Sequence, residues 1–136
     1  MKKYLFILGL FYFIANNAIA AGVAPPKVIG ATTVDTMFAM NLHEKKTPFI
    51  DVRPADYYTK GHIPGAINLP LENGFTSEAL SAVVKKNKPV VFYCNGISCQ
   101  ASAEATQKAL DWGWTSVFYY RAGFPGWEKA GLEIAK

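Results

Sequence analysis

The stretch "PVVFYC", residues 89–94, decides the fold. Val90–Tyr93 are all β-formers and none alternates with a charged or small polar residue, which is typical of a strand covered on both faces. Such strands occur mainly in parallel sheets whose two faces carry helices. The stretch "SAEATQKALDWGW", residues 102–114, follows with the length and apolar spacing of a helix. Together they predict a central strand followed by a crossover helix.

The same alternation extends to both sides of this unit. Further strands are predicted in "PFIDV" (48–52), "GAINLP" (65–70) and "SVFYY" (116–120). Further helices are predicted after a cap at Thr33, in "PADYYTKG" (54–61) and in "FPGWEKAG" (124–131). Another helix is predicted in "TSEALSAVVKKN" (76–87), with a cap at Thr76 or Ser77 and lysines in its last turn. Strands that alternate with helices predict an α/β fold, an open and mainly parallel sheet flanked by helices on both faces.

The first twenty residues, "MKKYLFILGLFYFIANNAIA", have the pattern of a secretory signal peptide. A cationic start precedes an apolar run from Tyr4 to Ile14, and Ala18 and Ala20 have A-x-A spacing. The run is about half of the ~20 residues that a membrane span needs. We therefore expect an exported, periplasmic protein with no stable membrane association after cleavage. An uncleaved N-terminal anchor is the alternative.

The rest of the chain predicts one domain, residues 33–136, behind a flexible leader, residues 21–32. Lys and Arg number 14 against 10 Asp and Glu, and "KKNK" at 85–88 is the only lysine cluster. A solvated helix end explains that cluster, so we expect no nucleic-acid partner. Two cysteines without nearby histidines are a weak metal site, so we expect neither a metal nor a cofactor.

Both cysteines of the chain, Cys94 and Cys99, lie on one loop behind the central strand. Ligands of open α/β sheets bind outside the carboxyl ends of the strands, which is where this loop begins. Backbone N–H groups and the following helix N-terminus would lower the pKa of the Cys94 thiol. The loop predicted to bind substrate comprises Asn95, Gly96, Ile97, Ser98 and Gln100, and Gly96 would allow it to curl.

A structural disulfide is the simplest explanation of two cysteines in an exported protein. However, a ring of six residues removes only about 2 kcal/mol of unfolded-state entropy. The C-x-x-x-x-C spacing also fits neither a thioredoxin-type nor a haem-attachment motif. We therefore favour a chemically active pair, with Cys94 as the catalytic residue and Cys99 as a resolving or redox partner. The spacing permits a reversible disulfide that switches the site off.

Two further stretches carry a family resemblance. "FIDVRPADYYTKGHIPGAINLP", residues 49–70, resembles the D-V-R and G-H-I-P-G-A segment of single-domain rhodanese-like proteins. "RAGFPGWEKAGLEI", residues 121–134, resembles their closing G-x-x-x-W-x-x-A-G-L segment. The strand that ends at Cys94 lies between them, where that family carries its catalytic loop. The resemblance spans roughly residues 33–134, which is nearly all of the predicted domain.

The resemblance implies a sulfurtransferase that needs no cofactor. Cys94 would take a sulfane sulfur from a donor such as thiosulfate, hold it as a persulfide, and pass it to cyanide or to a thiol, which a protein can carry. Asp51 and Arg53 match the D-x-R element of the family, which supports the wall of the active site. His62 lies within the G-H-I-P-G-A segment and is expected to be a structural histidine.

The loop departs from the family pattern. Many single-domain rhodaneses have arginine five residues after the cysteine and then a serine or threonine that opens the helix, whereas this loop has no arginine. The loop has the usual length if Cys99 takes the arginine position, and is two residues longer if Ser102 opens the helix. Efficient turnover of thiosulfate is therefore in doubt.

Two other functions remain open from the sequence. The first is a thiol–disulfide oxidoreductase or redox sensor in which Cys94 attacks and Cys99 resolves. The second is a catalytically silent binding module that uses the loop to hold a partner.

Overall fold

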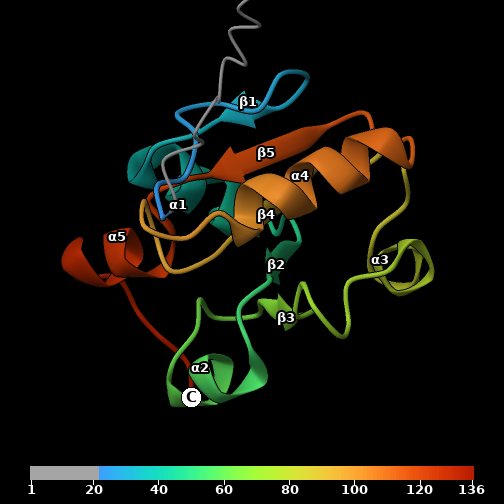
Figure 1. Ribbon diagram of the computed structural model, residues 1–136. Coiled ribbons are helices and arrows are strands. Elements are labelled where there is room, and N and C mark those ends of the chain that lie inside the picture. Colours follow the sequence, from blue (N-terminus) through green and yellow to red (C-terminus); the bar gives the residue numbers. More distant parts are fainter. Residues whose placement is uncertain (1–21) are drawn as a thin grey trace, which may run out of the picture.

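The computed structural model describes residues 22–136, and the predicted signal peptide lies outside this range. The strands are β1 (Thr32–Thr33), β2 (Phe49–Asp51), β3 (Ile67–Asn68), β4 (Val90–Tyr93) and β5 (Val117–Tyr120). The helices are α1 (Thr36–Glu44), α2 (Ala55–Lys60), α3 (Ser77–Val83), α4 (Ala101–Asp111) and α5 (Gly123–Lys129). Strands and helices alternate along the chain, as the sequence predicts (Figure 1).

The five strands form one sheet in the order β1-β5-β4-β2-β3, and every neighbouring pair is parallel. The central position of β4 is confirmed, because β2 and β5 pair with it on its two sides and all four of its side chains are 0% exposed. Tyr93 at the end of β4 is level with Asp51 and Tyr120. The register therefore brings the carboxyl ends of the three strands to one edge.

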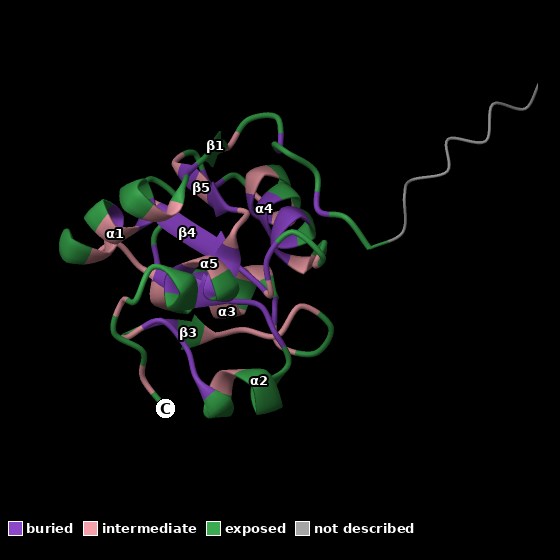
Figure 2. Ribbon diagram, turned by 90° about the vertical axis from the view of Figure 1, so that its left-hand side faces the viewer, coloured by how far each residue is buried: buried purple, intermediate pink, exposed green. Residues whose placement is uncertain are grey.

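Helices cover both faces of the sheet, as predicted. Leu80 of α3 and Ala105 of α4 pack with Phe92 on one face. Leu42 of α1 and Trp127 of α5 belong to the core on the other face. Figure 2 shows the buried strand β4 in the middle of the molecule, with exposed residues on the surrounding helices and turns and on the edge strands β1 and β3.

Two predicted helix boundaries are wrong. Asp35, not Thr33, caps α1, because its carboxylate accepts a hydrogen bond of 2.8 Å from the Phe38 N–H. Thr33 instead belongs to β1, a strand that the sequence pattern does not reveal. Helix α3 has its predicted cap at Thr76, but it ends at Val83, so that the lysines of residues 85–88 follow the helix rather than close it.

The segment expected as a flexible leader is packed onto the domain from Ala24 onward. Ala24 is 0% exposed, and Val28 packs against Ala103 and Tyr119. The Tyr119 hydroxyl donates a hydrogen bond of 3.0 Å to the Pro25 carbonyl. The segment is held because its carbonyl groups find donors on the rim of the sheet. Within residues 22–136, no helix has the length and apolar character needed to cross a membrane.

Candidate active site

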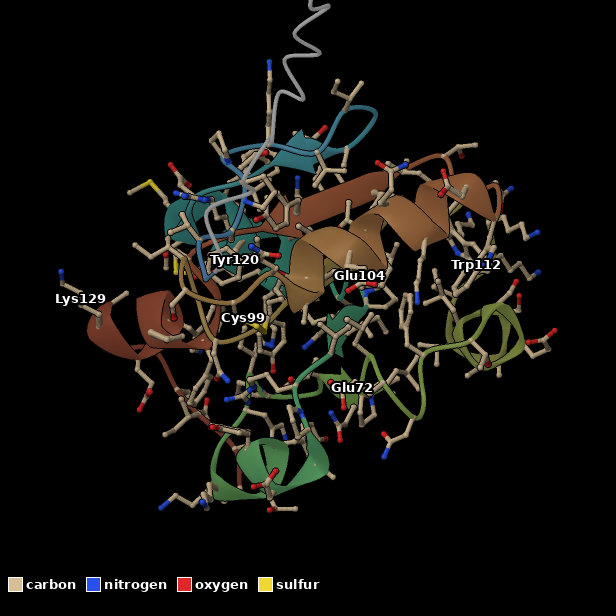
Figure 3. All side chains as sticks on the ribbon, viewed as in Figure 1. Glu72, Cys99, Glu104, Trp112, Tyr120 and Lys129 are labelled. Carbon is tan, nitrogen blue, oxygen red and sulfur yellow. A yellow bond between two sulfur atoms is a disulfide. The ribbon has the colours of Figure 1, made fainter. Side chains whose placement is uncertain are left out.

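Cys94 follows directly after β4, at the carboxyl edge of the sheet. It is 1% exposed and packs in the same apolar core as Val52 and Phe92. Figure 3 shows sulfur beside the Cys99 label, on the loop that leads into α4. The structure thus places the cysteine loop at the edge where open α/β sheets bind ligands.

The turn between β5 and α5 packs against this loop. The Phe124 N–H donates a hydrogen bond of 3.0 Å to the Cys94 carbonyl. Gly123 has a φ of +60°, and a Cβ there would collide with the same carbonyl. Gly96 has a φ of +89°, and a Cβ on it would lie 3.1 Å from the Ala122 carbonyl oxygen. Two glycines with left-handed backbone therefore let the turn and the loop approach closely.

Cys94 and Cys99 form a disulfide, with 6.3 Å between their Cα atoms. This separation lies within the range of roughly 4.4 to 6.8 Å that disulfides require. The Cys99 N–H donates a hydrogen bond of 3.0 Å to the Gly96 carbonyl, so that the loop turns back on itself. The structure therefore represents the oxidised form of the pair, in which Cys94 carries no free thiol.

The loop ends at Gln100, which caps α4, and the helix begins at Ala101. Ser102 lies inside the helix, where its carbonyl accepts a hydrogen bond of 2.7 Å from the Thr106 hydroxyl. This start matches the shorter of the two alignments, in which Cys99 stands where many single-domain rhodaneses have arginine. The positive end of the α4 dipole consequently lies beside the pair of sulfur atoms.

Asp51 and Arg53 form a buried ion pair beside the loop. Their side chains are 0% and 2% exposed, and 2.7 Å separates Nη2 from Oδ2. The Tyr93 hydroxyl also donates a hydrogen bond of 2.7 Å to Asp51. Burial and then the charge of Asp51 raise the pKa of Tyr93, so that this phenol remains a donor at any working pH.

Arg53 connects this ion pair to the cysteine loop. Its guanidinium donates to the Gly61 carbonyl at 2.7 Å and to the Asn95 side-chain oxygen at 3.4 Å. It also lies 4.4 Å from the centre of the Phe124 ring. Burial acts to lower the pKa of Arg53, but the hydrogen bonds and charge of Asp51, together with a smaller contribution from Tyr93, outweigh burial and raise it. Arg53 is thus a permanent cation that fixes the wall behind Cys94.

The model of the rhodanese-like domain family matches residues 36–130, which include the motif of residues 49–70, the cysteine loop and all but the last four residues of the motif of residues 121–134. The chain belongs to the rhodanese-like domain family.

Known proteins resemble this rhodanese-like domain over most of its length. It is 32% identical to YibN of Escherichia coli over 97 residues, which cover 70% of this chain and 65% of YibN. It is 36% identical over 85 residues to an HTH-type transcriptional regulator of Mycobacterium tuberculosis, covering 62% of this chain but only 36% of the regulator. The chain thus spans less than two thirds of either relative.

A human single-domain sulfurtransferase has a similar structure, with a TM-score of 0.62 and 25% identity. The similarity covers 73% of this chain and 96% of the human chain. The solved structures that share the rhodanese fold with this chain therefore include a protein described as a sulfurtransferase.

His62 of the rhodanese-like domain is engaged away from the disulfide. Its Nδ1 lies 2.8 Å from the Tyr58 carbonyl oxygen, and its ring stacks on the Tyr58 ring at 3.7 Å. Its backbone N–H and carbonyl both pair with Ala135. These contacts connect α2 to the C-terminal segment, and they support the interpretation of His62 as structural.

The exposed part of the loop is held by a segment that sequence reasoning missed. The Ala24 N–H donates to the Ile97 carbonyl at 2.7 Å, and Gln100 Nε2 donates to the Val23 carbonyl at 3.2 Å. Arg121, at the end of β5, donates to the Ala24 carbonyl from Nε at 3.2 Å and from Nη2 at 2.9 Å. The one feature of the sequence that could have indicated this contact is Arg121, a cation directly after the strand predicted in residues 116–120, at the edge of the sheet where Cys94 also lies.

Replacing Arg121 with methionine should loosen this attachment. A hydrogen bond from a charged donor contributes about 1.5 to 3 kcal/mol, so we expect amide exchange of Ala24 to rise roughly tenfold or more. Hydrogen exchange with mass spectrometry checks this, with the exposed Lys129→Met as the control. Equal protection of Ala24 in both variants would show that Arg121 does not hold the segment.

The described residues, 22–136, contain no cluster of three or more histidine, cysteine or acidic side chains that could hold a metal ion.

Proposed function

We propose that this protein is an exported sulfurtransferase that moves a sulfane sulfur through a persulfide on Cys94. The observation that carries the proposal is the position of Cys94. It ends the central strand and opens the loop before α4, in a domain whose structural relatives include a sulfurtransferase. The other loop residues, Asn95–Ser98 and Gln100, would supply backbone N–H groups to the anionic persulfide.

The transfer takes place in two displacements. The Cys94 thiolate attacks the outer sulfur of the donor, a new S–S bond forms on Cys94, and the donor's own S–S bond breaks. With thiosulfate as donor, sulfite leaves with the electron pair. The acceptor, cyanide or a thiol, then attacks the outer sulfur and restores the thiolate. Two easier steps replace one difficult step, which is the advantage of covalent catalysis.

The loop composition favours a thiol-bearing donor or acceptor over thiosulfate. Residues 94–100 contain no lysine or arginine to hold a dianion. Arg53, the cation that contacts Asn95 of the loop, is buried and paired with Asp51. We therefore propose that thiosulfate is a slow donor and that the physiological exchange involves thiols or persulfides, including those on proteins.

Intact-mass measurement tests the persulfide directly. The protein is reduced, freed of reductant and incubated with thiosulfate or with a low-molecular-weight persulfide. We expect a gain of one sulfur, about 32 Da, that disappears when cyanide is added. If no donor adds mass while both thiols are free, sulfur transfer is excluded and the binding-module interpretation gains support.

The observed disulfide favours a second candidate, a thiol–disulfide oxidoreductase or redox sensor. In that case, the reduced protein loses two hydrogens with a disulfide substrate and gains no sulfur. The same mass measurement therefore separates the two functions. Export is tested independently: the mass of the protein from a periplasmic extract should show an N-terminus near Ala21.

We expect the disulfide to act as an off switch, because the bonded Cys94 cannot accept a sulfur atom. Wild-type protein prepared without reductant should transfer sulfur at background rate and recover when reductant is added. Cys99→Ser should be active without reductant, because Cys94 then has no partner. Identical reductant dependence of the two proteins in a thiocyanate-forming assay would refute the switch.

A further inference from the structure

The two cysteines of the disulfide differ in exposure. Cys94 is 1% exposed within the core, whereas Cys99 is partly exposed and packs against the edge of the same core. A thiol that opens a disulfide must reach the sulfur that it attacks, so access helps to decide which sulfur reacts. The difference in exposure therefore favours attack on Cys99, whereas the sequence leads us to expect that Cys94 attacks and Cys99 resolves in an exchange reaction.

A hollow of about 160 Å³ reaches Ala101, two residues after Cys99 in the chain. Its lining residues come from the end of β2, the start of α2, the segment before α3 and the start of α4: Val52, Pro54, Ala55, Pro70, Leu71, Glu72, Asn73 and Ala101. Three of them, Val52, Leu71 and Ala101, pack in the same apolar cluster as Cys99. Part of the wall of the hollow thus belongs to the apolar cluster against which Cys99 packs.

The chemistry of the lining is uneven. Most of the lining residues are apolar, and the one charged side chain among them is Glu72, on the segment between β3 and α3 (Figure 3). The lining contains no cationic side chain. The hollow therefore suits a short aliphatic chain, and its field favours a neutral or positively charged molecule over an anion.

We propose that this hollow binds the thiol that opens the disulfide, and that this thiol attacks the sulfur of Cys99. The ligand is a small aliphatic thiol, preferably one with an amino group that can approach Glu72. The inference extends the proposed function, since the released Cys94 is the sulfur acceptor. Opening of the disulfide needs no sulfur donor, so the two proposals fail separately.

The step is a balanced thiol–disulfide exchange. The incoming thiolate forms a bond to the Cys99 sulfur, and the bond between Cys94 and Cys99 breaks. The electron pair stays on Cys94, which leaves as a thiolate beside the N-terminus of α4, where that charge is stabilised. A second thiol then attacks the mixed disulfide, releases the symmetrical disulfide of the ligand, and restores the Cys99 thiol.

The first test locates the mixed disulfide. Oxidised protein is mixed with cysteamine, quenched with acid at short times, alkylated, and fragmented in a mass spectrometer. We expect the early adduct on Cys99 and the alkyl group on Cys94. An early adduct on Cys94 would overturn the proposal.

The second test measures charge selection. The rate of disulfide opening is compared for cysteamine and for 2-mercaptoethanesulfonate, in wild type and in Glu72→Lys. Since one charge pair across a few ångströms of water contributes about 1 kcal/mol or less, we expect the cysteamine preference to fall by roughly three- to tenfold in the variant. The difference should shrink as salt is raised.

The matched control is Glu44→Lys, which makes the same charge change at the end of α1, before β2 begins. An equal loss of preference in this control, or none in Glu72→Lys, would show that Glu72 does not select the thiol.

A third variant tests the hollow itself. Ala55→Phe should fill it and slow opening by both thiols, whereas Ala82→Phe on the exposed side of α3 should not. If both phenylalanine variants opened as fast as wild type, the hollow would not be the binding site.

Discussion

Cys94→Ser should reduce sulfur transfer to the uncatalysed background, a loss on the order of a thousandfold or more, while the protein remains folded. The serine hydroxyl is far less acidic than a thiol and cannot hold a sulfane sulfur as a persulfide. Cys94 is 1% exposed, and serine is close to it in size, so the core around Val52 and Phe92 should persist. Thiocyanate formation and intact mass after thiosulfate treatment measure the loss.

Cys99→Ser is the matched control, because it breaks the same disulfide but keeps the Cys94 thiol. Both variants lose the ring, which contributes about 2 kcal/mol under oxidising conditions. Circular dichroism should show the same fold in both. Transfer above background in Cys94→Ser would remove Cys94 from the mechanism. Loss of transfer in fully reduced Cys99→Ser would place Cys99 in the catalytic cycle and favour the oxidoreductase.

Arg53→Ala should lower both stability and activity, with an expected cost of about 3 to 5 kcal/mol in the free energy of unfolding. The variant leaves Asp51, which is 0% exposed, without the cation that compensates it. It also removes the donors to the Gly61 carbonyl and to Asn95, so that the cysteine loop loses its support. Denaturant unfolding, together with sulfur transfer below the transition, measures the two effects.

Lys60→Ala is the control for Arg53→Ala, since it removes an exposed cation from the end of α2 and should leave both quantities nearly unchanged. A different outcome would change the role of Arg53. If Arg53→Ala lost activity at an unchanged free energy of unfolding, Arg53 would be a ligand of the substrate rather than a support of the wall.

The parts of the fold that follow local patterns could be predicted from the sequence. The uninterrupted apolar run before Cys94 predicted a buried central strand, and β4 is that strand. Pro54 and Gly61 correctly bounded α2. By contrast, the sequence pattern wrongly predicts Thr33 as the cap of the first helix, because β1 is only two residues long and depends on pairing with β5. A strand that short has no periodicity of its own.

The candidate site also has a part that the sequence predicts and a part that only the tertiary structure decides. The spacing of Cys94 and Cys99, and the glycine between them, predicted one reactive loop behind a strand, because four intervening residues keep the two cysteines close together. The disulfide that this spacing permits is present, but only the tertiary structure decided that Cys94 is buried while Cys99 stays partly exposed. It also bound Ile97 of that loop to Ala24, 73 residues earlier in the chain. Contacts between distant segments depend on how helices and strands pack, and no local pattern of residues encodes them.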